Sequence, residues 1–125
     1  MEKTKLRQKF EEIKEKVINN DYLTYKEQLF LIDQKYFDIF KKYIQYVSLC
    51  SEAEIELVKR GSVEFIDAYI AKYYLYNEAE VELAKRGNVE LIKAYITKHS
   101  FCDEAKIEFM KLENKELIKV YHEKK

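Results

Sequence analysis

Few side chains in this sequence could bind a metal, and their spacing does not suit that chemistry. The candidate ligands are two histidines and two cysteines, His99, His122, Cys50 and Cys102. His99 and Cys102 lie three residues apart, but a tetrahedral zinc site needs further ligands and no second pair has metal-binding spacing. We therefore expect no metal site and no cofactor.

Nucleophilic and acid–base chemistry are also poorly supported. Cys50 and Cys102 precede expected helix N-termini, where a thiol pKa can fall. The same position 26 residues away holds Thr24 or Tyr76, which favours a packing or loop role. The sequence has neither a GxSxG motif nor a Gly-rich phosphate loop, and most carboxylates recur in register rather than as a pair in different environments. We expect a protein that is not an enzyme.

These residues belong to a repeat that becomes visible when the sequence is shifted by 26 positions. LCSEAEIELVKRGSVEFIDAYIAKYY (residues 49–74) aligns with LYNEAEVELAKRGNVELIKAYITKHS (residues 75–100), and residues 101–125 form a third similar copy. Residues 23–48 are a diverged copy with matching apolar positions. Self-similarity at a period of this size is typical of stacked helical arrays.

Each copy is expected to form two helices. Ser51 with Glu54, and Asn77 with Glu80, have the spacing of a capping box, in which the glutamate returns to the backbone amide of the N-cap residue. The first helix is expected to end at a glycine in the left-handed conformation. The glycines are Gly61 and Gly87, and the expected N-caps of the second helices are Ser62, Asn88 and Asn114.

The sequence thus predicts an all-α fold, a right-handed α-solenoid of four tandem 26-residue helical hairpins plus an N-terminal capping helix. We expect one domain, with residues 1–22 as the capping half-repeat and hairpins at 23–48, 49–74, 75–100 and 101–125. Leu6, Phe10, Ile13 and Val17 form an apolar stripe on the first helix. This stripe fits a helix that covers the first hairpin, although docking on a separate partner remains an alternative.

The motif EAExELxKRG-(S/N)VE-(F/L)I-x-AYI resembles short α-hairpin solenoid repeats, broadly the HEAT and leucine-rich-repeat-variant types. The resemblance covers residues 23–125, with a repeat much shorter than that of HEAT proteins. It implies an extended helical scaffold but no catalytic or binding residues.

Composition argues against several partner classes. The 23 basic and 23 acidic residues cancel, and no stretch is basic enough for a phosphate-binding stripe, which argues against nucleic acid as a partner. No segment approaches the ~20 apolar residues of a membrane span, and the N-terminus does not read as a signal peptide. We expect a cytoplasmic protein with both thiols reduced, because Cys50 and Cys102 lie two repeats apart.

Tyrosine is the most suggestive residue type. Tyr43, Tyr69, Tyr95 and Tyr121 share one repeat position on the apolar arc, which predicts a core role. Most of the others cluster near the turns between repeats, where partner binding and partial burial explain them equally well. The candidate binding residues are Tyr46, Tyr73, Tyr74, Tyr76, Lys72, Lys98 and His99.

The leading hypothesis is a non-catalytic protein–protein interaction module, a small adaptor or scaffold that binds through its inter-repeat turns. The alternative is an inhibitor or regulator that docks on a nucleic-acid-handling protein through a repeated glutamate ridge. This ridge comprises Glu52, Glu56, Glu78, Glu82, Glu104 and Glu108. The same glutamates also fit an ordinary solvated face with pairs such as Glu56 and Arg60. Self-association remains open.

Overall fold

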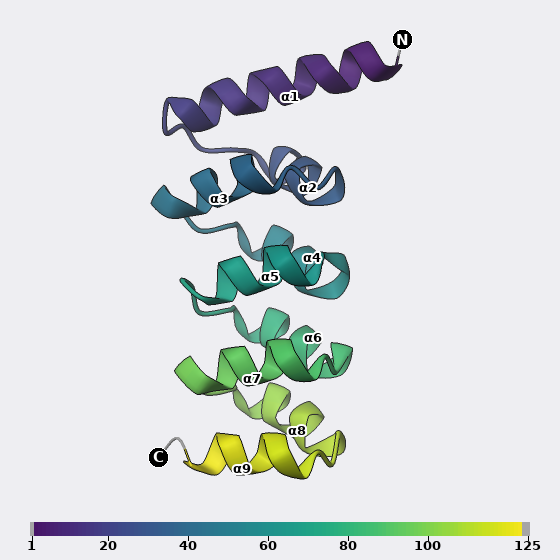
Figure 1. The fold of residues 1–125 in the computed structure, drawn as a ribbon, viewed down its shortest axis with the longest axis vertical. Coiled ribbons are helices and arrows are strands. Elements are labelled where there is room, and N and C mark those ends of the chain that lie inside the picture. The colour runs from purple at the N-terminus through teal and green to yellow at the C-terminus, as the bar shows by residue number, and fades with distance from the viewer. Residues whose placement is uncertain (1, 124–125) are drawn as a thin grey trace. The chain divides into compact units, whose positions relative to one another are not determined.

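The computed structural model describes residues 2–123, which fold into α-helices joined by short loops (Figure 1). The helices are α1 (Glu2–Ile18), α2 (Tyr25–Asp33), α3 (Phe37–Tyr46), α4 (Ser51–Arg60), α5 (Val63–Ile70), α6 (Asn77–Arg86), α7 (Val89–Lys98), α8 (Asp103–Lys111) and α9 (Lys115–Glu123). No strand occurs within residues 2–123, so the predicted all-α class is confirmed. None of the described helices combines the length and apolar composition required to cross a bilayer.

The chain divides into two compact units at a boundary within α4. Unit 1 is Met1–Ala53 and unit 2 is Glu54–Lys125. In unit 1, α1 and α2 both pack against α3. Ile13 and Val17 of the predicted apolar stripe are buried, and the ring centroids of Phe10 and Tyr36 lie 4.3 Å apart. Leu6, at the other end of the stripe, is exposed.

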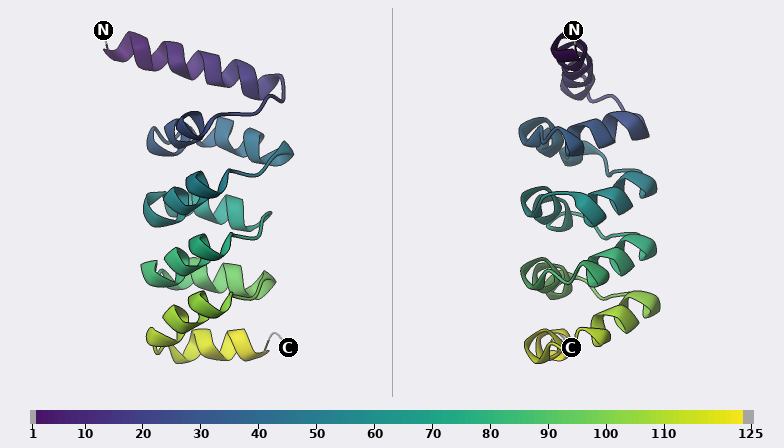
Figure 2. Two further views of the ribbon diagram at one scale, coloured as in Figure 1. Left: turned by 180° about the vertical axis from the view of Figure 1, so that it is seen from behind. Right: turned by 90° about the vertical axis from the view of Figure 1, so that its right-hand side faces the viewer.

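In unit 2, the odd-numbered helices α5, α7 and α9 follow one another in one row, and α6 and α8 lie in a second row (Figures 1 and 2). Packing joins α5 to α7, α7 to α9 and α6 to α8, so α5, α6 and α7 each contact the helix two places further along the chain. The core contains apolar residues from both rows, among them Ile66, Leu83, Ile92 and Phe109.

Side-chain caps open α5, α7 and α9 as predicted. The side chain of Ser62 accepts a hydrogen bond of 3.4 Å from the backbone N–H of residue 65. Asn88 and Asn114 each accept one of 3.0 Å from the backbone N–H three residues on. Such caps satisfy donors that an α-helix leaves unpaired at its first turn.

The predicted capping boxes at Glu54 and Glu80 are wrong. The N-cap of α6 is Tyr76 rather than Asn77, and no side chain caps it. Both glutamates are buried, at 1% and 4% exposure, and bind partners far away in the sequence. A complete capping box occurs instead at the start of α2, between Thr24 and Glu27.

The predicted left-handed glycine is confirmed at Gly87, with φ of 69°, but not at Gly61. A Cβ atom at Gly61 would lie 2.5 Å from the carbonyl oxygen of Leu57, so this glycine is required by a close backbone approach. The left-handed conformation occurs at the equivalent positions of the first and last copies, where Lys35 (φ 60°) and Glu113 (φ 52°) adopt it without being glycine.

Candidate functional site

A buried carboxylate connects three successive elements of unit 2. Oε2 of Glu54, on α4, accepts a hydrogen bond of 2.7 Å from the hydroxyl of Tyr69 on α5. Oε1 of the same carboxylate accepts one of 2.5 Å from the backbone N–H of Tyr76, which precedes α6. We call this arrangement a polar joint: a buried Glu or Gln on the first helix of a hairpin, the Tyr of the second helix, and the backbone N–H that precedes the next helix.

The same joint recurs 26 residues further on. Glu80 accepts hydrogen bonds from the hydroxyl of Tyr95 and, at 2.7 Å, from the backbone N–H of Cys102. The Tyr95 hydroxyl in turn accepts a hydrogen bond of 3.2 Å from the backbone N–H of Leu75. Every buried polar atom named here therefore has a partner, as buried polar groups require.

Unit 1 contains a neutral version of the joint, built on Gln28. Its Oε1 accepts a hydrogen bond of 3.0 Å from the backbone N–H of Cys50, and its Nε2 donates to the hydroxyl of Tyr43 at 3.4 Å. That hydroxyl accepts from the backbone N–H of Leu23 at 3.1 Å. In the last copy the equivalent residue is Lys106, which is exposed, with its Nζ 6.0 Å from the centroid of the Tyr121 ring.

The titratable groups of the joints are buried, and burial shifts their pKa values. Burial raises the pKa of the Glu54 carboxyl, despite the hydrogen bonds from Tyr69 and Tyr76 that favour the charged form. Burial together with the neighbouring Glu80 carboxylate raises the pKa of the Tyr95 hydroxyl. At most 4% of the surface of Glu54, Glu80, Tyr69 and Tyr95 is exposed.

The joints fix the segment between α5 and α6. Glu54 holds the N–H of Tyr76, Tyr95 holds the N–H of Leu75, and the Leu75 side chain is itself buried. The side chains on either side of Leu75 consequently face solvent, with Tyr74 at 69% exposure and Tyr76 at 54%. An anchored backbone thus presents two exposed tyrosines.

Further predicted binding residues surround this segment. The ring centroid of Tyr74 lies 3.9 Å from that of His99, whose ring lies 4.8 Å from that of the buried Tyr95. Lys98 Nζ donates a hydrogen bond of 3.1 Å to the carbonyl oxygen of Ala71. The end of α7 is thereby tied to the segment that follows α5.

Two more candidates complete the group. The ring of Tyr73 stacks on that of Tyr69 with centroids 5.0 Å apart, and Lys72 Nζ lies 5.8 Å from the Tyr73 centroid. Tyr73 is half-buried and Lys72 is exposed. We call the resulting surface of unit 2 the aromatic edge; its residues are Lys72, Tyr73, Tyr74, Tyr76, Lys98 and His99.

Tyr46 belongs to unit 1 and makes internal contacts. Its hydroxyl donates a hydrogen bond of 2.9 Å to the carbonyl oxygen of Asp21, and its ring meets that of Tyr43 edge-on at 5.4 Å. The side chain is half-buried, and burial raises the pKa of its hydroxyl. We therefore leave Tyr46 out of the aromatic edge.

Part of the predicted glutamate ridge lines a groove in unit 2. Glu78, Glu82 and Glu104 lie along it with Ile55, Val81, Asn77 and the cationic Lys59.

Two other glutamates of the predicted ridge form ion pairs, Glu56 with Arg60 at 3.2 Å and Glu108 with Lys111 at 2.9 Å. The Lys111 hydrogen bond lowers the pKa of Glu108. Glu52 belongs to unit 1, where it is exposed and accepts a hydrogen bond of 3.0 Å from Ser51.

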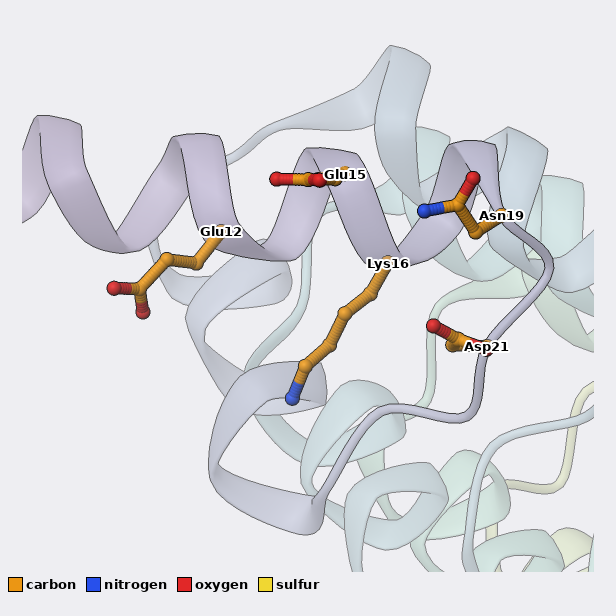
Figure 3. Close-up of a pocket in the computed structure, with 5 residues that line it drawn as sticks. All are labelled: Glu12, Glu15, Lys16, Asn19 and Asp21. Carbon is orange, nitrogen blue, oxygen red and sulfur yellow. The ribbon is translucent and has the colours of Figure 1, made fainter.

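A second acidic hollow lies in unit 1, at the end of α1 (Figure 3). Its lining residues are Glu12, Glu15, Lys16, Asn19 and Asp21. Lys16 Nζ lies 2.8 Å from Oε2 of Glu27 on α2, and this hydrogen bond raises the pKa of Lys16. Burial of Glu27 opposes ionisation, but the bonds from Lys16 and Thr24 outweigh it, so the pKa of Glu27 is lowered. The lysine thus ties α1 to α2.

The histidines and cysteines were the candidate metal ligands and nucleophiles. Within residues 2–123, no group of three or more His, Cys, Asp or Glu side chains is placed to hold a metal ion. Cys50 and Cys102 are free thiols. Burial raises the pKa of Cys102, and its Sγ lies 3.8 Å from a carboxylate oxygen of Glu104, so its position as N-cap of α8 does not activate it.

Sequence reasoning missed the polar joints, although a signal for them was present. Glu54 and Glu80 fall in the middle of an apolar helical arc, and each copy with a Glu or Gln there also has the core tyrosine 15 residues later. The buried acid and the buried hydroxyl could have been paired on that basis.

No protein-family model, no curated protein and no solved structure matches this chain. The resemblance to short helical repeats therefore rests on the residues alone.

Proposed function

We propose that this protein is a non-catalytic interaction module, built as a right-handed α-solenoid of four tandem hairpins, that binds another protein through the aromatic edge. The observation that supports this most is the exposure of Tyr74 and Tyr76 on a backbone held by buried hydrogen bonds. Tyrosines on a pre-ordered segment contribute large contact area at a small cost in conformational entropy.

The charges of the aromatic edge indicate the chemistry of the partner. Lys72, Lys98 and His99 flank the tyrosines, and residues 71–76 and 97–100 contain no Asp or Glu. Complementary potentials favour a partner that presents carboxylates beside an apolar or aromatic contact. We expect an acidic, aromatic-containing segment of another protein. The cytoplasm is the proposed location, because two free thiols suit a reducing compartment.

The test is a comparison of two double variants in a pull-down from native extract, read by mass spectrometry. Tyr74→Ala with Tyr76→Ala removes the exposed tyrosines of the edge without touching a buried ring. Tyr22→Ala with Tyr25→Ala is the matched control, because these unit 1 tyrosines are also exposed, at 78% and 41%. A partner lost only with the first variant supports the proposal, and one retained by it refutes the assignment of the edge.

A second candidate function is docking on a basic partner through the acidic groove, favoured by the lining of Glu78, Glu82 and Glu104 around Val81. Such binding should weaken steeply as ionic strength rises, whereas tyrosine-anchored binding should not. Replacing all three glutamates by Gln would abolish it. Replacing Glu64 and Glu90, which are exposed glutamates outside the groove, by Gln provides the control.

A further inference from the structure

The outer face of α8 differs from the face of α6 that it repeats. Ala84 of α6, the helix on which α8 packs, is completely buried, whereas its counterpart Met110 is 41% exposed. Val81 is partly covered, whereas its counterpart Ile107 is 60% exposed. Residues 2–123 thus leave α8 without the covering helix that α6 has.

These side chains line a shallow apolar hollow whose charges are ordered along the helix. The hollow is formed by Asp103, Lys106, Ile107, Met110 and Lys111. Asp103 and its neighbour Glu104 lie at the N-terminal end of α8, and Lys111 lies at the C-terminal end. Ile107 and Met110 lie between these two ends in the sequence of α8.

We propose that this face binds the same face of a second copy of the chain, with the two α8 helices antiparallel about a two-fold axis near Ile107. In that arrangement the carboxylates of Asp103 and Glu104 lie opposite Lys111 of the second copy. The two-fold symmetry forms this charge pairing twice, once at each end of the contact. A parallel pair would place like charges together at both ends, which is unfavourable. The inference does not depend on the aromatic edge.

The covered face of α2 argues against head-to-tail packing of two copies. Head-to-tail packing would require a free face on α2, but α1 already covers it, with Lys16 on Glu27 and Lys9 Nζ 5.0 Å from the ring centroid of Phe30. The like-charged Lys106 residues approach one another near the two-fold axis. Each can remain over its own Tyr121 ring, where Nζ lies 6.0 Å from the centroid.

The contact is small because it is centred on one nine-residue helix. Interfaces well below the standard size form weak complexes, so we expect a dissociation constant on the order of 100 μM. The dimer should therefore appear only at high concentration.

The experiment is sedimentation equilibrium of the full chain from about 10 μM to about 1 mM, a range that brackets the expected constant. Ile107→Ser should raise the dissociation constant at least tenfold. Ile18→Ser is the matched control, because Ile18 is 62% exposed in unit 1, and it should leave dimerisation unchanged. Circular dichroism verifies that each variant keeps the wild-type helix content.

A charge exchange tests the antiparallel arrangement itself. Lys111→Asp alone should weaken the dimer about tenfold, because it places acids opposite acids. Adding Asp103→Lys to this variant should restore most of the lost affinity. A chain that is monomeric at about 1 mM, an Ile107→Ser variant that dimerises normally, or a double exchange without recovery would each overturn the proposal.

Discussion

The hydroxyl of Tyr69 lies 2.7 Å from a carboxylate oxygen of Glu54, and both side chains are almost fully buried. The other oxygen of that carboxylate binds the backbone N–H of Tyr76. A buried acid with two donors is stabilised locally, but its removal from water still raises its pKa. The stability of unit 2 should consequently depend on pH and on the integrity of this contact.

Replacing Glu54 by Gln should reduce the pH dependence of stability. Because the pKa of Glu54 is raised on folding, the folded state binds more protons than the unfolded state above the unfolded pKa of about 4.3. The contribution of Glu54 to the free energy of unfolding is therefore largest below the unfolded pKa. It is lost as the pH rises from the unfolded pKa through the folded pKa. An amide in place of the carboxylate does not titrate, and Gln28 shows that an amide can occupy the equivalent position of a joint.

The measurement is urea unfolding of wild type and Glu54→Gln at several pH values from about 4 to 7. The wild type should lose more stability than the variant as the pH rises. Glu90→Gln, at an exposed site, should follow the wild type. Parallel curves for wild type and Glu54→Gln would contradict the assignment of the pH dependence to the joint.

Replacing Tyr95 by Phe should destabilise the protein strongly. The change leaves the Glu80 carboxylate and the N–H of Leu75 each without one hydrogen bond in a buried site, at a cost of about 2–4 kcal/mol. Tyr121→Phe is the matched comparison, because Tyr121 is only half-buried. Among the contacts described, its hydroxyl accepts a single hydrogen bond, from the backbone N–H of Phe101. It should cost under about 1 kcal/mol. Chemical denaturation that gave equal losses for the two variants would refute the importance of the joint.

Replacing Lys35 or Glu113 by Gly should stabilise the protein. Both residues are exposed and hold a left-handed conformation that costs a residue with a side chain about 1–2 kcal/mol. The greater entropy of glycine in the unfolded chain offsets part of this gain, leaving about 0.5–1 kcal/mol for each change. Thermal unfolding measures the gain. A lower melting temperature for both variants would be inconsistent with left-handed strain.

The two glycines should respond differently to Ala. At Gly61 a new Cβ would lie 2.5 Å from the backbone oxygen of Leu57, and the backbone must move. At Gly87 the nearest atom would be 3.6 Å away, and only the positive φ opposes the side chain. We expect losses of about 2–3 kcal/mol for Gly61→Ala and about 1 kcal/mol for Gly87→Ala, from denaturation midpoints. The reverse order would show that steric contact does not govern Gly61.

Sequence reasoning predicted the helical class and the caps at Ser62, Asn88 and Asn114, because these depend on contacts within a few residues. It failed at Glu54, because the three-residue spacing from Ser51 matches a capping box and predicted a local hydrogen bond. The actual partners, Tyr69 and Tyr76, lie 15 and 22 residues away, and a local pattern carries no information about such distances.

The same limit applies to the candidate surface. The turn tyrosines could be selected from composition and repeat position, but exposure separates them. Tyr74 and Tyr76 are exposed, whereas Tyr46 binds Asp21 and Tyr73 stacks on Tyr69. These outcomes depend on which backbone amides the buried joints hold, and that is a tertiary property.

The constant spacing within the joints bears on how such a chain can grow. The acceptor and the amide it binds are 22 residues apart at Gln28, Glu54 and Glu80. An in-frame duplication of residues 75–100 would supply its own acid, its own hydroxyl and an amide at the correct interval for both neighbours. Inserting one residue inside that interval would separate the bonded groups. Copying a whole 26-residue block would preserve the bonded pairs, whereas a change of length within the block would separate them.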